Sequence, residues 1–154
     1  MTACGLVAAL LAGVLVPAPV PAGQTPTNWF GTWTLNVAKS ASGSEPPRYK
    51  RATLRVESFQ DGVTMIDEMV RSRGGLRHLE WTGKFDGLDY PVEGVEAALT
   101  NAYRRLDDRT LEIIQKLDGV VVATGRLTLS PDGKTLTRAT SDGTGSTTTI
   151  YEKP

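Results

Sequence analysis

Residues 28–40 read NWFGTWTLNVAKS, and at this stretch an apolar leading segment gives way to strand-forming sequence. Side chains alternate between the two faces of a strand, so one face here carries Trp29, Gly31, Trp33 and Leu35. The missing side chain of Gly31 lets a neighbour approach closely, and the indole of Trp33 can plug the end of a barrel or cap a sheet core. We expect Gly31 and Trp33 to be structural residues at a barrel end. The plainer alternative is a first strand that simply buries two tryptophans.

The segment before this strand has the pattern of a secretory signal peptide. Residues 1–24 contain no charged side chain, and the apolar run 6–16 is shorter than the roughly 20 residues of a membrane-spanning helix. Small residues favour cleavage after Ala22, with Ala18 as the alternative. The only cysteine, Cys4, would leave with the leader, so no disulfide is expected. The sequence predicts a secreted or periplasmic protein with a signal peptide at 1–22, a short disordered lead-in at 23–28 and a single barrel domain at 29–154.

The charge balance makes no case for a polyanionic partner. The chain has 17 basic and 17 acidic residues, so its formal net charge is zero. A basic cluster of Arg71, Arg73 and Arg77 flanks two glycines, which is typical of a solvated hairpin end. We expect no nucleic-acid partner, no integral membrane segment after leader cleavage, and a monomer.

Asp-Gly pairs recur along the chain, with Asp at positions 61, 86, 118, 132 and 142, and a Gly-Gly pair stands at 74–75. Asp-Gly supplies the positive φ angles of tight hairpin turns. About ten segments of strand length lie between these turns, and only residues 92–98 could form a turn or two of helix. The sequence therefore predicts an all-β antiparallel meander of 8–10 strands, which removes its edges by closing into a small barrel.

The strand faces favour a cavity over a dry core. Leu79, Trp81 and Phe85 share a face, but alternate residues of 120–128 mix valine and threonine with Arg126. A dry core tolerates few polar groups without partners, whereas a wet or ligand-filled cavity accepts them. Inside such a cavity Arg126 could hold an anionic head group; on the outer face it would be a surface arginine.

Further candidates for the interior polar end are Arg138 and Tyr151, each on one of the two closing strands, and Trp81 is a candidate for the ligand lining.

The sequence offers little basis for catalysis or metal binding. His78 is the only histidine and shares a strand face with Glu80, but zinc needs three or four converging ligands. Asp67 and Glu68 are adjacent, so they point to opposite faces and cannot act as a pair. No nucleophile motif or phosphate loop is present. We expect no enzyme activity, no catalytic residue, no metal and no cofactor.

Several short motifs carry a resemblance to known proteins. Gly31-Thr32-Trp33 matches the Gly-x-Trp opening of lipocalins, and residues 149–153 (TIYEK) are similar to the closing motif of fatty-acid-binding proteins. Together with GTWTLN, FDGLDYPVEG, DDRTLEI and DGKTLT, they resemble small exported bacterial lipocalin-like proteins of the calycin group. The resemblance implies a barrel that binds a small hydrophobic or amphipathic molecule in its interior.

Two departures bear on that expectation. The arginine that fatty-acid-binding proteins place two residues before the final tyrosine is Thr149 here, and their helical lid is replaced by a short, Pro-containing loop at 41–48. Two other classes of function stay open. A protein-interaction or inhibitor module would have a packed core with Tyr90 and Tyr103 as loop anchors, and an enzyme would need a polar barrel pocket.

Overall fold

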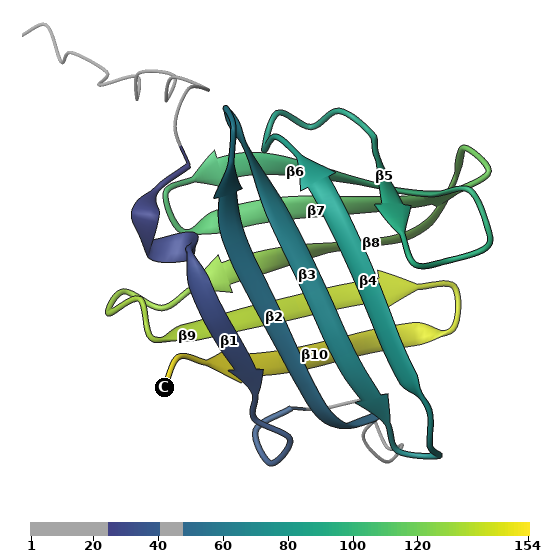
Figure 1. The fold of residues 1–154 in the computed structure, drawn as a ribbon, viewed down its shortest axis with the longest axis horizontal. Coiled ribbons are helices and arrows are strands. Elements are labelled where there is room, and N and C mark those ends of the chain that lie inside the picture. Colours follow the sequence, from purple (N-terminus) through teal and green to yellow (C-terminus); the bar gives the residue numbers. More distant parts are fainter. Residues whose placement is uncertain (1–24, 41–47) are drawn as a thin grey trace, which may run out of the picture.

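Ten antiparallel strands follow one another around a closed barrel in the computed structural model, which describes residues 25–40 and 48–154 (Figure 1). A short 3-10 helix, η1 (Thr27–Trp29), precedes them. The strands are β1 (Gly31–Leu35), β2 (Tyr49–Phe59), β3 (Gly62–Arg71), β4 (Leu76–Gly83), β5 (Tyr90–Glu93), β6 (Leu99–Asp107), β7 (Thr110–Leu117), β8 (Val120–Leu129), β9 (Thr135–Asp142) and β10 (Gly145–Glu152). The predicted all-β barrel is confirmed.

The turns largely follow the Asp-Gly pattern. Asp118 (φ 50°) and Gly119 (φ 79°) form the two-residue connection between β7 and β8, where both positive φ angles suit the twist of the flanking strands. Asp86 is the exception, because it lies in the β4–β5 connection and forms an isolated bridge with Arg104. Residues 92–98, which could have carried a turn or two of helix, contain none: 92–93 end β5 and 94–98 are bends and irregular chain.

The barrel closes where β1 meets β10, and this seam is short. Only Thr34 and Leu35 pair with Glu152 and Tyr151 across it. A side-chain bond from Asn36 Nδ2 to Glu152 Oε2 (3.0 Å) reinforces the seam between residues 116 positions apart. Figure 1 shows β1 lying between β2 and β10, with the front strands β2–β4 crossing over β6–β10 behind them.

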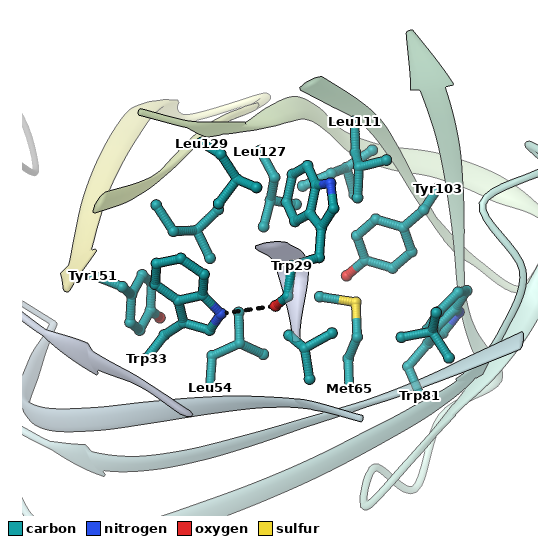
Figure 2. Close-up of a cluster of buried hydrophobic side chains, with 14 of the residues drawn as sticks. Trp29, Trp33, Leu54, Met65, Trp81, Tyr103, Leu111, Leu127, Leu129 and Tyr151 are labelled. Carbon is teal, nitrogen blue, oxygen red and sulfur yellow. Dashed lines mark hydrogen bonds between the residues drawn. The ribbon is translucent and has the colours of Figure 1, made fainter. Parts of the chain in front are cut away.

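Two tryptophans plug the end of the barrel reached by η1. Trp33 is fully buried, as predicted, and its Nε1 donates to the carbonyl oxygen of Trp29 at 3.1 Å (Figure 2). Trp29 in turn donates through Nε1 to the carbonyl oxygen of Asp108 (3.1 Å). The Lys153 ammonium covers Trp33, 4.4 Å from its ring centroid. Each indole N–H is therefore bonded to a backbone carbonyl, which fixes both rings at this end of the barrel.

The start of the domain differs from the sequence prediction in two ways. Trp29 belongs to η1 and not to the first strand, and Thr27 and Asn28 are part of that helix, not of a disordered lead-in. Gly31 has a φ of +124°, and a Cβ there would approach Lys153 Cε at 3.4 Å. The close neighbour that Gly31 admits is therefore the lysine side chain that covers Trp33.

The plugged half of the barrel is a dry core. Figure 2 shows Trp29 at the centre of a ring of buried side chains contributed by strands from all around the barrel. Seven leucine and valine residues of this core are no more than 2% exposed: Leu54, Val56, Val63, Leu111, Leu127, Leu129 and Leu136. The remaining half of the interior is the part left for a site.

Some predictions fall on residues outside the described part of the chain. These are the signal peptide at 1–22 with its cleavage site, Cys4, and most of the short loop at 41–48. Among the described residues, no helix has the length and apolar character needed to cross a bilayer.

Candidate functional site

The half of the barrel away from the tryptophan plug contains a cavity of about 250 Å³. The β9–β10 hairpin, with exposed Ser141 and Asp142, borders this cavity together with Arg48, so its mouth lies at this end of the barrel. Apolar lining comes from Leu35, Val37, Met69, Leu79, Ile113 and Ala123, with the tyrosines Tyr49, Tyr103 and Tyr151. Threonines, two serines, two amides and five charged side chains supply the rest. The wall is thus amphipathic.

An ion pair crosses the interior of this cavity. Arg138, on β9, donates from Nη1 and Nη2 to the two carboxylate oxygens of Asp67, on β3, at 3.4 and 3.2 Å. The two side chains are only 18% and 15% exposed. Burial, the largest single influence, acts to lower the pKa of Arg138, but the charge and hydrogen bonds of Asp67 together with the nearby Tyr151 and Tyr103 outweigh it, and the pKa lies above its ordinary value. The guanidinium is therefore a permanent buried cation, neutralised by one carboxylate.

One hydrogen-bond donor of the Arg138–Asp67 pair has no acceptor within the described part of the chain. Arg138 Nε is buried and has no hydrogen-bond acceptor among the described residues. A buried donor without a partner costs about 1–3 kcal/mol, so the arrangement favours anything that supplies an acceptor nearby. Arg138 also lies over the Tyr151 ring, with Cζ 5.7 Å from its centroid.

Two buried phenols flank the ion pair. Burial raises the pKa of Tyr151 to about 12, and burial likewise raises the pKa of Tyr103. Both therefore remain neutral hydroxyl groups at physiological pH. They can donate or accept one hydrogen bond each at the wall of the cavity.

A chain of amides continues the polar wall. Gln115 Nε2 donates to Asn101 Oδ1 (3.0 Å), and Asn101 Nδ2 lies 3.4 Å from the hydroxyl of Tyr103. Behind this chain, Trp81 Nε1 donates to the Asn101 carbonyl oxygen (3.0 Å), and its ring is 4.6 Å from that of Tyr103. Trp81 is buried and does not line the cavity; it supports the residues that do.

Arg126 does not face the cavity, and this expectation was wrong. Leu127 and Leu129 point into the dry core, so period-2 alternation sends Arg126 to the outer face, where it is exposed. It stands opposite Glu112 on β7. The valine and threonine face that suggested a cavity is the outer face, with Val120 67% exposed. Leu127, Gly125 and Ala123 form the inner row instead.

Of the predicted site residues, the structure brings Arg138 and Tyr151 together at the cavity. The sequence missed Asp67 as their partner, although its expected facing, opposite to Glu68, is correct. Thr149, which stands where fatty-acid-binding proteins have an arginine, lies directly across from Arg138 in the β9–β10 register. An arginine therefore enters this part of the barrel from the adjacent strand.

His78 has no place in the site. It is on the outer face of β4, with Nδ1 3.7 Å from Glu68 Oε1, and both side chains are more than half exposed. No group of three metal-ligating side chains occurs among the described residues. The proposed loop anchors are also not free aromatics. Tyr103 is buried, and Tyr90 packs edge-on against Trp81 with its hydroxyl donating to Asp86 (2.8 Å).

Comparison with known proteins finds the fold and no sequence family. No family model matches the chain, and no curated protein matches it. Crystal structures of the fluorescent protein UnaG do match: a single-site mutant with a TM-score of 0.58 at 12% identity, and the wild type with 0.53 at 13%. The matches cover 83% of this chain and 97% or 98% of UnaG. At this identity the likeness concerns architecture alone, and it agrees with the ten-strand closure: the chain has the calycin-type barrel fold.

Proposed function

We propose that the protein is a binding protein that holds one small amphipathic molecule in the open half of its barrel. The observation that carries the proposal is the 250 Å³ cavity walled by the Arg138–Asp67 pair, inside a barrel whose other half is packed dry. Ligand pockets usually measure about 300–1,000 Å³, so the ligand would be small.

Energetics support a binding role over a purely structural one. Unfilled volume and buried charges both work against stability, since a well-packed hydrophobic core of the same volume is often as stable or more so. A cavity that keeps both is easier to understand if a ligand fills it. Leu35, Met69 and Ile113 would contact an apolar body, while Arg138 and Tyr151 would meet a polar end.

Binding without chemistry is the simplest form of the proposal. The described lining includes serines at Ser40 and Ser141 but no histidine or cysteine that could act with them. We therefore also propose that the protein is not an enzyme. Export and a monomeric state belong to the same proposal, and export rests on the sequence of residues 1–22.

The test fills the cavity. Native mass spectrometry of the purified protein would identify a retained ligand, and titration with amphiphiles can be followed by the fluorescence of Trp81, which contacts Tyr103 of the lining. In Ala123→Phe the new ring enters the cavity, and we expect binding to fall at least about tenfold. The matched control is Ala139→Phe, on the exposed outer face of β9. Equal binding by both variants, or no binding by any of the proteins, would contradict the proposal.

A further inference from the structure

We propose that the cavity selects an uncharged ligand whose polar end is a hydrogen-bond acceptor, such as an amide or ketone carbonyl, and that Asp67 enforces this selection against carboxylates. The inference rests on the proposed binding function and names its ligand class. Asp67 is a specificity-determining residue in this view, because it occupies the cation that an anionic ligand would need.

The first argument is that the deep part of the cavity has no net charge. Asp67 lies 3.2 Å from Arg138 and is its counter-ion. Tyr103 and Tyr151 are neutral, as are Asn101 and Gln115. A carboxylate placed here would have to share the guanidinium with Asp67, and two carboxylates at one site repel each other strongly at low dielectric.

The second argument is that donors remain for a neutral acceptor. Each terminal nitrogen of a guanidinium carries two N–H groups, and Asp67 accepts from one on each. Among the described residues no other acceptor engages Arg138. A carbonyl oxygen can take such a charge-assisted bond without displacing Asp67 and without adding charge.

The charges near the mouth do not reverse this balance. Arg48 lies close enough to Asp142 to lower the pKa of that carboxyl, where Thr144 makes the larger contribution. Arg77 is the third arginine of the lining, and it makes no ion pair with a described residue. It is partly exposed on β4, beside the β3–β4 turn, so solvent and salt screen its attraction for anions.

The experiment compares two isosteric probes, octanamide and octanoate, by isothermal titration calorimetry at neutral pH. We expect the wild type to bind octanamide at least about tenfold more tightly than octanoate. In Asp67→Asn the guanidinium becomes an uncompensated cation, and the preference should reverse in favour of octanoate. Glu68→Gln is the matched control, because it removes one negative charge from the outer face of the same strand and should leave the ratio unchanged.

If Asp67→Asn does not fold, Asp67→Asn combined with Arg138→Gln removes both charges and leaves neither unpaired. We expect this double variant to lose at least about tenfold in octanamide affinity. Unchanged affinity would show that the head group lies elsewhere and would overturn the inference.

The outcomes separate the inference from the proposed function. Equal or tighter binding of octanoate by the wild type, or an unchanged ratio in a folded Asp67→Asn variant, would leave a binding protein but refute the selection. Failure of both probes to bind any variant would refute both.

Discussion

Trp33→Ala should be among the most destabilising single substitutions in this barrel. The indole is fully buried, and truncating such a side chain costs about 3–5 kcal/mol from lost burial and the cavity left behind. The substitution also removes the donor to the Trp29 carbonyl oxygen, and an unpaired buried acceptor adds about 1–3 kcal/mol unless water reaches it. The sum is a large part of the roughly 5–15 kcal/mol by which domains are stable.

Urea denaturation followed by circular dichroism measures this loss, because the tryptophan signal itself is altered. Trp33→Phe should cost much less than Trp33→Ala, since it keeps an aromatic ring and loses only the N–H donor and part of the ring volume. Thr32→Ala, on the exposed face of the same strand, is the control and should stay within about 0.5 kcal/mol. A midpoint for Trp33→Ala equal to that of Thr32→Ala would show that the plug contributes nothing and would refute the reasoning.

The Lys153 contact can be isolated from the same plug. Lys153→Met should lose about 0.5–2 kcal/mol in the wild type, and much less of that when Trp33 is already alanine, because the ammonium then has no ring to cover. Equal losses in the two backgrounds would assign the lysine's contribution to its bond with the Asn28 carbonyl oxygen instead.

Two further predictions concern the strands around the cavity. Gly125→Ala should cost about 1–3 kcal/mol, because the new Cβ would press on the Ala139 carbonyl oxygen and lie 2.9 Å from Thr140 Cα. In Gly143→Ala, the control, the new Cβ meets open space, so its stability in the same urea titration should be near that of the wild type. Equal losses of stability in the two variants would contradict this. The pKa of Tyr151 is raised by burial from 10.0 to about 12, so the unfolded phenol loses its proton first and stability should fall as pH rises from about 10 to about 12. Between about pH 9 and pH 11.5 the wild type should lose about 2 kcal/mol more than Tyr151→Phe, and parallel pH profiles would show that Tyr151 is not the group responsible.

The barrel itself could be predicted because its signals are local. Asp118-Gly119 requires only the φ preferences of two adjacent residues, and the burial of Trp33 follows from one bulky aromatic on an alternating strand. Ten such strands with tight turns leave few alternatives to closure. The turn and strand signals of the local sequence agree with the closed topology, so the barrel could be predicted from them.

The site could be predicted only in part, because its key contact joins strands that are distant in sequence. Arg138 and Asp67 are separated by 71 positions and meet across the barrel interior. No local sequence pattern reveals a contact between residues so far apart in the chain. The alternation of Asp67 and Glu68 shows only that one of them faces inward. Arg138 and Tyr151 were found because they lie on neighbouring strands near the end of the chain.

The error over Arg126 has a specific physical cause. Both faces of β8 carry small or aliphatic residues, so polarity alone does not distinguish inside from outside. The pairing of β7 and β8 also shifts between Gln115 and Lys116, and such an irregularity changes which residues lie opposite each other. In the folded barrel Leu127 and Leu129 are buried in the core, and their positions show that Arg126 lies on the outer face of β8.

The short seam between β1 and β10 has a consequence for how the chain reaches its native state. All the other pairings in the barrel join strands that are consecutive in the sequence, so these hairpins can form early with little loss of chain entropy. The seam joins residues 116 positions apart, and it adds only two register pairs in return. We expect closure to come last, as a slow step on the millisecond-to-second scale typical of non-local β topologies. Until then β1 and β10 would present open edges, and the interval before closure is when this chain is most exposed to pairing with a second copy of itself.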